Sequence, residues 1–280
     1  MEKAIKRYFP IFVLPTMIAF TLGFIIPFAE GVYLSFCKFT TVNDAKLIGL
    51  SNYAKVFKDS TFVHAFWYTA AFTVVSVILI NVLAFAVALL LTKGIKGTNV
   101  FRTVFFMPNL IGGIVLGYIW QLLLNGILMK FSRTLTYSST FGFWGLVILM
   151  CWQQIGYMMI IYIAGIQNIP GELIEAAEID GATKRQVLKS VTIPMVMPSI
   201  TVCTFLTLTN SFKLFDQNLA LTNGEPSKMS EMLALNIFNT FYGRAGYEGV
   251  GQAKAVIFFI LVAAIALTQN YLTRRKEVQQ

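Results

Sequence analysis

The sequence predicts an all-α polytopic membrane protein with six transmembrane helices. Of its 280 residues, 56% are hydrophobic and only 12% are charged, which is unlike the mix found in a soluble globular domain. The apolar residues gather in runs of about 20 or more, the length that an α-helix needs to cross a bilayer core. Because a soluble fold would have to expose several of these runs, we expect a single transmembrane domain over residues 1–280.

The apolar runs are separated by segments that hold nearly all the charge and most of the turn residues. We expect the six spans at about 11–36, 63–91, 104–124, 142–166, 192–215 and 250–271. Pro15, Pro27 and Pro198 are expected kink sites, since neighbouring groups in a bundle can satisfy the carbonyls that a proline leaves free. The first run has no small-residue cleavage site, so it is expected to be a retained helix rather than a signal peptide.

The distribution of basic residues predicts that both termini lie in the cytoplasm. With the N-terminus inside, short cytoplasmic segments hold Lys3, Lys6, Arg7, Lys93, Lys96, Arg102, Lys184, Arg185, Lys189, Arg274, Arg275 and Lys276. The longer exterior loops then hold Lys38, Lys46, Lys55, Lys58, Lys130, Arg133, Lys213, Lys228, Arg244 and Lys254. The higher density inside fits the positive-inside rule, although four lysines in the loop 37–62 oppose it.

The sequence argues against catalytic, metal-binding and nucleic-acid chemistry. His64 is the single histidine, and the three cysteines, Cys37, Cys151 and Cys203, form no disulfide framework and no metal-binding cluster. There is no G-x-x-x-x-G-K-[ST] loop for nucleotide phosphates and no credible catalytic triad. The net charge of +9 is explained by anionic lipid headgroups beside the spans. We therefore expect a chain in the lipid bilayer that is not an enzyme and binds no nucleic acid.

Small residues at a spacing of four predict close helix packing. Gly113 and Gly117 form a GxxxG motif, and Ala84 and Ala88 form a similar pair. This pattern fits packing within one subunit and also fits a seam between subunits.

A polar segment at 169–191 separates the fourth and fifth spans on the predicted cytoplasmic side. The stretch "GELIEAAEI" favours a helix with Glu172 and Glu175 in its first turn, where the helix dipole stabilises acidic groups. Asp180 and Gly181 then break the helix, and "ATKRQVLKSVTI" resumes it. The spacing alone fits a docking surface for a partner, and it equally fits an amphipathic connector that lies on headgroups.

The stretch "EAAEIDGATKRQVLKSVTIPMVMP" resembles the EAA loop of the permease subunits of ATP-binding-cassette importers. The matching positions are Glu175, Ala176, Ala177, Asp180, Gly181, Ala182, Ile193 and Pro194. The resemblance implies that the helix with Glu172 and Glu175 is a coupling helix seated in a cleft of a cytoplasmic ATPase, with Gly181 as the bend. Leu188 stands where members often carry Phe, and the helix face stays apolar.

Three further stretches are similar to the carbohydrate uptake branch of this family. They read "LIGLSNYAKVF", "FFMPNLIGGIVLGYIW" and "FKLFDQNLALTNGEPSKMSEMLALNIFNTFY". The elements typical of the branch are Phe215, Asp216, Leu221, Thr222, Gly224 and Pro226. Members commonly read Gly-Gly-Pro where this chain has Glu225, which affects only the detail of that loop.

The resemblance implies a transporter with several different subunits. This chain would pair with a second, homologous but different permease, two copies of a cytoplasmic ATP-binding subunit, and an extracytoplasmic solute-binding protein. ATP and Mg would be bound by the partner ATPase, so no cofactor and no metal are expected in this chain. Closure of the ATPases would switch the spans from inward-facing to outward-facing. A carbohydrate is the expected solute, and a glycerol phosphodiester is the alternative within this branch.

Polar and aromatic side chains inside the spans are the candidates for a sugar pathway, because a sugar needs hydrogen bonds and an aromatic face. The candidates are Gln121, Trp152, Gln153, Gln154, Tyr157, Asn210, Phe212 and Asp216. Each could instead be a structural hydrogen-bonding group between helices, and Asn81 is expected to be one. Lys213 is expected to be solvated near the outer end of its span.

Two rival functions make different demands on the sequence. An ion-coupled secondary transporter would work alone and would need paired, buried ionisable residues near the middle of its spans, where this sequence has almost none. A membrane-anchored scaffold would need no polar pathway.

Overall fold

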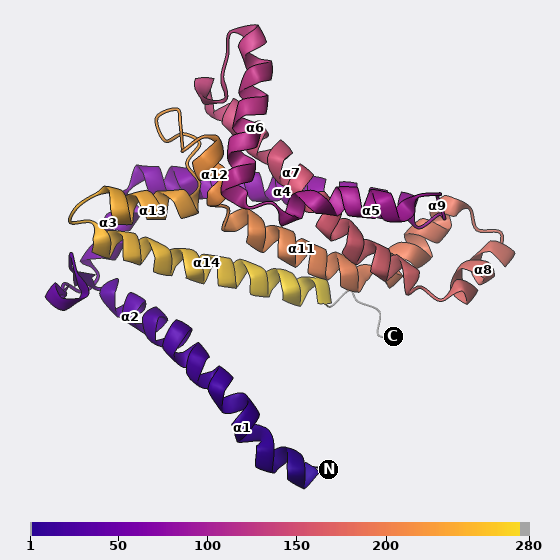
Figure 1. The fold of residues 1–280 in the computed structure, drawn as a ribbon, viewed down its shortest axis with the longest axis horizontal. Helices are drawn as coiled ribbons and strands as arrows, with labels where there is room; N and C mark the ends of the chain where they lie inside the picture. Colours follow the sequence, from indigo (N-terminus) through magenta and orange to yellow (C-terminus); the bar gives the residue numbers. More distant parts are fainter. Residues whose placement is uncertain (1, 275–280) are drawn as a thin grey trace. The chain divides into compact units, whose positions relative to one another are not determined.

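The structure, a computed structural model, describes residues 2–274 and is built almost entirely of helices (Figure 1). Arg275 and Lys276, two of the predicted cytoplasmic basic residues, lie outside the described residues. The chain divides into two compact units. One unit comprises the residues up to Ser60 together with Ile237–Ile260, and the other comprises Thr61–Asn236 and the segment from Leu261 onward.

The first unit begins with one long apolar helix. Helix α1 (Glu2–Phe20) continues through a π-helical turn into α2 (Ile26–Leu34). Residues Phe9–Leu34 are long and apolar enough to cross a membrane. Pro27 is the second residue of α2, which directly follows the π-helical turn, so the helix departs from regular α-helical hydrogen bonding just before the residue that lacks an N–H.

A small cap follows α2 in the same unit. Its elements are β1 (Cys37–Lys38), antiparallel to β2 (Lys46–Leu47), and α3 (Ser51–Lys58), together with the end of α13 (Leu233–Gly243) and the start of α14 (Glu248–Arg274). The buried Asn52 amide donates from Nδ2 to the Ser35 and Cys37 carbonyls at 2.9 and 2.8 Å. In the loop between the strands, the backbone N–H groups of Thr40 and Thr41 lower the pKa of Asp44.

One charged pair in this unit was not predicted. Lys254 was assigned to an exterior loop, but the structure places it on α14 with no exposed side-chain surface. Its Nζ lies 2.7 Å from Asp59 Oδ2 and donates to Thr240 Oγ1 at 2.8 Å. Lys254 lies in the first two turns of α14, so the pair is near the end of this helix rather than at its middle.

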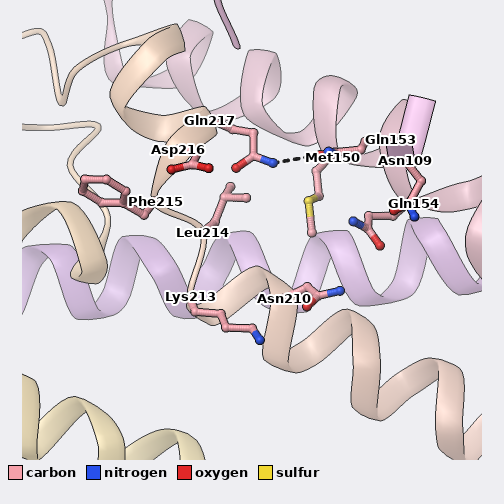
Figure 2. Close-up of a pocket in the computed structure, with 10 residues that line it drawn as sticks. All are labelled: Asn109, Met150, Gln153, Gln154, Asn210, Lys213, Leu214, Phe215, Asp216 and Gln217. Atoms are coloured by element: carbon pink, nitrogen blue, oxygen red, sulfur yellow. Dashed lines mark hydrogen bonds between the residues drawn. The ribbon is translucent and has the colours of Figure 1, made fainter. Parts of the chain in front are cut away.

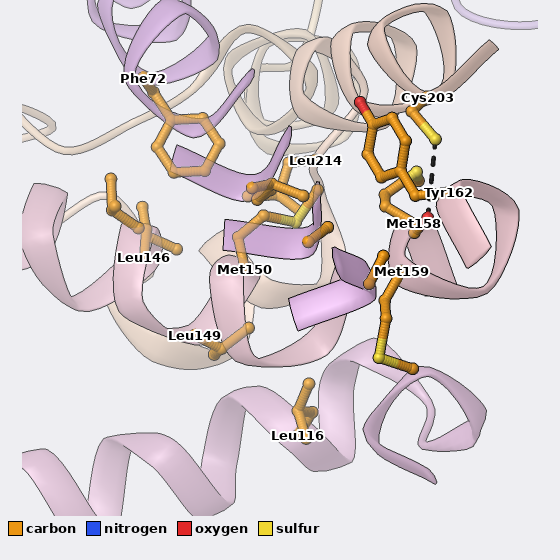
Figure 3. Close-up of a cluster of buried hydrophobic side chains, with 14 of the residues drawn as sticks. Phe72, Leu116, Leu146, Leu149, Met150, Met158, Met159, Tyr162, Cys203 and Leu214 are labelled. Atoms are coloured by element: carbon orange, nitrogen blue, oxygen red, sulfur yellow. Dashed lines mark hydrogen bonds between the residues drawn. The ribbon is translucent and has the colours of Figure 1, made fainter. Parts of the chain in front are cut away.

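The second unit is a helical bundle whose core surrounds α7. Its helices are α4 (Ser60–Leu91), α5 (Thr98–Phe106), α6 (Gly113–Leu128), α7 (Ser139–Gln167), α8 (Gly171–Ile179), α9 (Lys184–Val187), α10 (Ile193–Met195), α11 (Met197–Phe212) and α12 (Asp216–Leu221). Figure 3 shows buried side chains of α7, such as Leu149 and Met158, facing Leu116 of α6 and Cys203 of α11. This packing makes α7 the central element of the unit.

The third predicted span starts in the wrong place. Residues from 104 onward were expected to form one helix, but α5 ends at Phe106 and α6 begins only at Gly113. Between them, Met107–Leu110 forms a short 3₁₀ turn that contains Pro108. The end of α5 packs directly on α7, as shown by Gly156, where an added Cβ would collide with the Phe105 carbonyl oxygen. Proline and this close contact therefore separate the two helices.

The fifth predicted span is bent by 68° between Lys184–Met195 and Met197–Phe212. The expected kink at Pro198 occurs just before it, and Pro198 lies in the first turn of α11. The helix before the bend continues through a π-helical turn to Met195 and includes Pro194. Five described helices are long and apolar enough to cross a membrane, or six if the bent pair is one span.

Two predictions about helix packing are confirmed. Asn81 of α4 donates to Thr207 Oγ1 of α11 at 2.9 Å and accepts from the Tyr162 hydroxyl of α7 at 2.7 Å. This residue therefore joins three helices, as expected for a structural group. The GxxxG motif packs within the subunit, since a Cβ at Gly113 would lie 2.7 Å from Asp216 Cβ, and one at Gly117 would lie 2.5 Å from Ala220 Cβ.

Candidate functional site

A polar pocket of about 380 Å³ opens in the second unit, where α7, α11 and α12 meet the turn between α5 and α6 (Figure 2). It is lined by Asn109, Met150, Gln153, Gln154, Asn210, Lys213, Leu214, Phe215, Asp216 and Gln217. Four of these, Gln153, Gln154, Asn210 and Asp216, are predicted pathway residues. The local breaks in the helices place them together: Lys213–Phe215 link α11 to α12, and Asn109 lies in the 3₁₀ turn.

The amide of Gln153 is used within the protein. Gln217 Nε2 donates to Gln153 Oε1 at 2.8 Å, and Gln153 Nε2 contacts the Ile111 carbonyl at 3.5 Å. This chain of amides joins α12, α7 and the segment before α6. Gln153 therefore shapes the wall of the pocket.

The neighbouring Gln154 has a buried hydrogen-bond acceptor that no described residue uses. Its side chain is only 7% exposed, and its Oε1 accepts no hydrogen bond from the described part of the chain. Figure 2 shows this amide between Asn109 and Asn210 on the wall of the pocket. A buried acceptor without a partner is costly, so this end of the pocket is suited to a ligand that donates hydrogen bonds. Amides on three elements can both donate to and accept from hydroxyl groups.

The other end of the pocket is charged. Asp216 is half-buried at the start of α12, and Gly113 leaves room for its side chain. Lys213 is exposed, as predicted, and it also lines the pocket. A carboxylate is an acceptor only, so Asp216 can accept hydrogen bonds from two hydroxyls.

The remaining predicted pathway residues do not line this pocket. The Trp152 ring packs against Trp120 with ring centroids 5.5 Å apart, and Tyr157 lies near Phe106. Gln121 Nε2 donates to the Leu221 carbonyl at 3.1 Å, which ties α6 to α12. Phe212 is buried within the bundle.

Sequence reasoning missed Asn109 and Gln217 as lining residues. Asn109 was hidden because the segment around Pro108 was expected to be a continuous helix. Gln217 directly follows Asp216, so the break that begins α12 was the signal for it. The described residues hold no group of three or more His, Cys, Asp or Glu side chains that could bind a metal ion.

The predicted polar segment folds as two helices with a defined break. Gly181 directly follows Asp180, the C-cap residue of α8. Its φ of +79° lies in the left-handed region, which favours glycine. Its N–H donates to the Glu178 carbonyl at 3.0 Å, and the Ala182 N–H donates to the Ala177 carbonyl at 2.9 Å. This pair of bonds is a Schellman motif, which satisfies the last carbonyls of α8.

The second helix of this segment has its own start signal. Thr183 Oγ1 accepts from the Gln186 N–H, and Gln186 Oε1 accepts from the Thr183 N–H at 2.8 Å. This capping box fixes the first turn of α9 directly after the glycine. The two motifs together hold α8 and α9 at a fixed bend.

Most of α8 is uncovered. Glu172, Glu175 and Ala176 are exposed, and Leu173 and Ile179 are 42% and 86% exposed. These acidic and apolar side chains are therefore not covered by the rest of the described unit.

Helix α8 lies at one end of the second unit, far from α12 (Figure 1). Along α7, Gln153 and Gln167 are fourteen residues apart, or about 21 Å of helix. The pocket therefore lies well inside the helical bundle, and α8 lies beyond its end.

Comparison with known proteins identifies the family. Residues 92–278 match the model of the binding-protein-dependent transport system inner membrane component. The chain belongs to this family. It is 43% identical over 278 residues to the probable starch degradation products transport system permease protein AmyD of Thermoanaerobacterium thermosulfurigenes, covering 96% of this chain and 94% of the relative.

Other relatives are more distant but span nearly the same length. The multiple sugar-binding transport system permease protein MsmF of Streptococcus mutans is 28% identical and covers 99% of each chain. The trehalose/maltose transport system permease protein MalF of Thermococcus litoralis is also 28% identical, covering 91% of this chain and 90% of the relative.

Solved structures share the fold. A permease chain of a bacterial ABC transporter for import of the acidic polysaccharide alginate superposes with a TM-score of 0.81 at 21% identity, and the match covers 98% of each chain. A methionine ABC transporter matches with a TM-score of 0.59 at 20% identity, over 78% of this chain and 96% of the other. The chain therefore has the fold of an ABC importer permease.

Proposed function

We propose that this chain is a permease subunit of an ATP-driven importer for a carbohydrate, a sugar or an oligosaccharide. The single observation that carries the proposal is the 43% identity, over nearly the whole chain, to a permease named for starch degradation products. Linear gluco-oligosaccharides are therefore the first substrates to test.

The chemistry of the pocket supports a sugar as the solute. Asn109, Gln154 and Asn210 offer amides, Asp216 offers a carboxylate, and Phe215 adds a ring to the lining. This set can bind vicinal hydroxyls and the C–H face of a sugar ring. We assign the pocket to the translocation pathway. Trp152, Tyr157, Phe212 and Gln121 stay predictions for other stages of that pathway.

We assign α8 to coupling with a cytoplasmic ATPase. Its uncovered surface includes Glu172, Glu175 and Ala176, and the bend at Gly181 would pass its movement to α9. The Asp180 and Ala182 N–H groups donate to the Ala176 and Ala177 carbonyls at the end of α8. Pro194 lies further along, on α10. ATP and Mg would be bound by the ATPase.

The proposed assembly contains this chain, a second and different permease, two ATP-binding subunits and an extracytoplasmic solute-binding protein. In it, the chain crosses the cell membrane six times as one domain, with both termini in the cytoplasm and the bent pair as its fifth span. Labelling of Lys184 in intact cells tests this orientation. Reaction from outside would overturn both the topology and the coupling role.

The test of function is uptake by the purified complex in vesicles. We expect labelled maltotriose to enter only with ATP and the loaded binding protein. Uptake of a labelled glycerol phosphodiester, without uptake of maltotriose, would identify the alternative solute. Uptake by this chain alone, driven by an ion gradient, would identify a secondary transporter, and no uptake with any solute would favour a scaffold.

A further inference from the structure

Helix α3 of the first unit has an apolar face that the rest of its unit leaves uncovered. Leu50, which directly precedes the helix, is 68% exposed, and Phe57 is 70% exposed. Leu50, Ala54 and Phe57 follow each other at spacings of four and three residues, so they share one face of the helix, and Ala54 is exposed as well. The opposite side of α3, with Asn52 and Val56, is buried in the cap.

Basic and aromatic side chains lie beside this face. Lys55 and Lys58 are exposed on α3, next to the apolar residues. Lys55 Nζ lies 6.0 Å from the centroid of the Tyr247 ring, and Arg244 Cζ lies 6.0 Å from the same centroid. Tyr247 is itself 44% exposed. Exposed leucine and phenylalanine beside lysine, arginine and tyrosine are typical of protein surfaces at the membrane–water interface.

The acidic residues of the cap do not neutralise its lysines. Asp44 Oδ1 accepts from the N–H groups of Thr40 and Thr41 at 2.9 Å, and Asp59 pairs with Lys254. Within the described part of the chain, no ion pair is made by any of the four lysines of residues 37–59, which are Lys38, Lys46, Lys55 and Lys58. These are the four lysines that oppose the positive-inside rule. The surface is therefore complementary in charge to an anionic partner.

Hydrogen bonds tie α3 to the end of the first candidate span. Ser35 directly follows α2, and its carbonyl oxygen accepts from Asn52 Nδ2 at 2.9 Å. Ser35 Oγ and the Tyr53 hydroxyl share a second bond of 2.7 Å. The span Phe9–Leu34 has 26 residues, or about 39 Å of helix, so in a hydrocarbon core of about 30 Å its ends reach the headgroup layers. The two bonds thus hold α3 at the depth of the lipid headgroups.

We propose that α3 lies on the bilayer surface and binds anionic lipid, with Leu50 and Phe57 among the upper parts of the acyl chains and Lys55 and Lys58 on headgroup phosphates. The apolar face leaves water, and the long lysine stems let each ammonium reach the phosphates. The proposed topology puts this surface on the outer leaflet, but the contact depends on neither the solute nor ATP. It fixes the depth of the first span, because α3 is bonded to the end of that span.

A spin label at Ala54→Cys measures the depth of the apolar face. The full complex is reconstituted in nanodiscs of phosphatidylcholine with phosphatidylglycerol, and the spectrum of the natural complex, treated with the same label, is subtracted. We expect the label to collide more with oxygen, which concentrates in hydrocarbon, than with a water-soluble nickel chelate. A preference for the chelate would place the face in water, and protection from both reagents would place it under another protein subunit. Either result overturns the proposal.

The change Lys58→Gln tests the contact with headgroups. Labelled phosphatidylglycerol is added to phosphatidylcholine nanodiscs, and energy transfer is read from a dye at Ala54→Cys. We expect the mole fraction of phosphatidylglycerol for half-maximal transfer to rise about fivefold, as for one lysine near an anionic surface, and high salt to weaken the natural response. Lys130→Gln is the matched control, since Lys130 is also exposed and lies outside α3. Equal responses of the two variants would rule out Lys58 as a headgroup contact.

The double change of Leu50→Ser with Phe57→Ser separates lipid contact from folding. Because the described unit covers neither side chain, we expect the thermal midpoint in detergent to stay unchanged while the label at Ala54→Cys loses its preference for oxygen. Leu50→Met with Phe57→Leu keeps the face apolar and should keep that preference. A lower midpoint with an unchanged oxygen preference would assign both side chains to the fold and overturn the proposal. Normal maltotriose uptake by a natural complex that failed the depth test would still uphold the proposed function.

Discussion

Gln217 on α12 and Gln153 on α7 are joined by a hydrogen bond of 2.8 Å from Nε2 to Oε1. This bond gives two adjacent glutamines different roles. The Oε1 of Gln153 accepts a hydrogen bond within the protein, whereas the buried Oε1 of Gln154 accepts none from the described chain. The pocket wall thus has one residue that shapes it and one that can bind a ligand.

Replacing Gln154 should weaken solute recognition and spare the fold. The Gln154→Leu change removes the free acceptor with little change of volume, so we expect the half-saturating maltotriose concentration in direct uptake to rise about fivefold, since one hydrogen bond contributes about 1 kcal/mol. The thermal midpoint should not fall, because an unpartnered buried polar atom is lost. A lower midpoint with normal uptake would contradict this assignment.

Replacing Gln153 should mainly destabilise the fold, unlike replacing Gln154. The Gln153→Leu change leaves the Gln217 amide without its acceptor, and we expect the free energy of unfolding to fall by about 1–3 kcal/mol. Denaturant titration of the purified subunit measures this loss. The second change, Gln217→Leu, should recover part of it in a double-mutant cycle. Independent, additive losses would show that the bond contributes nothing.

The contact between α6 and α12 should depend on two glycines. A Cβ at Gly113 or Gly117 would lie 2.7 or 2.5 Å from side-chain atoms of Asp216 or Ala220, so each change to Ala should lower stability by about 1–3 kcal/mol. Gly126→Ala is the control, because nothing lies within 4 Å of its Cβ position, and it should stabilise α6 by up to about 1 kcal/mol. Unfolding midpoints that rank Gly126→Ala with the other two would contradict the packing.

The bend after α8 should need glycine at position 181. With φ at +79°, the change Gly181→Ala should cost about 1–2 kcal/mol locally, and Gly181→Pro should also remove the N–H that the Glu178 carbonyl accepts. We expect both variants to insert, and Gly181→Pro to abolish ATP-driven uptake. Gly171→Ala is the control, since its Cβ would meet nothing within 4 Å.

The change Glu175→Ala tests the same surface without altering the backbone. Glu175 is exposed, so its loss should leave the free energy of unfolding within about 0.5 kcal/mol of the natural value. A loss of ATP-driven uptake in this variant would then be caused by a lost contact with the ATPase. Full uptake in both Glu175→Ala and Gly181→Pro would rule out α8 as the coupling element.

The sequence predicted helix positions well where the signal was long and apolar, and less well where helices break. The α7 segment was predicted to within a few residues because its whole length is apolar and it lies at the centre of a unit. The separation of α5 from α6 was missed, because Pro108 in an apolar run can mark either a kink or an end. In the structure it marks an end: α5 stops at Phe106, where it packs on α7 at Gly156, and α6 begins only at Gly113.

The candidate site shows the same limit. Gln153 and Gln154 were equally good candidates from the sequence, since adjacent residues of a helix differ only in direction. Their roles depend on Gln217, which reaches Gln153 only because α12 begins after a break. Trp152 was expected in the pathway because of its residue type, and its ring packs on Trp120 outside this pocket, so its pathway role stays a prediction. Tertiary contacts, rather than residue type, decide which polar groups remain available.

The buried pair of Lys254 and Asp59 gives the last prediction. Removing one partner leaves a buried charge uncompensated, so Asp59→Ala should lower the free energy of unfolding by about 3–5 kcal/mol. Lys58→Ala, one residue earlier and exposed, should change it by no more than about 0.5 kcal/mol. Denaturant titration compares the two, and equal effects would show that the pair is not buried in the natural membrane environment.

The same pair also separates a structural role from ion coupling. The double change of Lys254→Met with Asp59→Leu removes both charges and keeps the volume, and such replacements are often neutral or stabilising. Because Lys254 lies in the first two turns of α14 and donates to Thr240, we expect the double variant to regain stability and to keep ATP-driven uptake. A secondary transporter that moved a proton through Lys254 would lose transport in this variant, whatever its stability. Uptake by the double variant therefore distinguishes a charge that holds helices together from one that carries an ion.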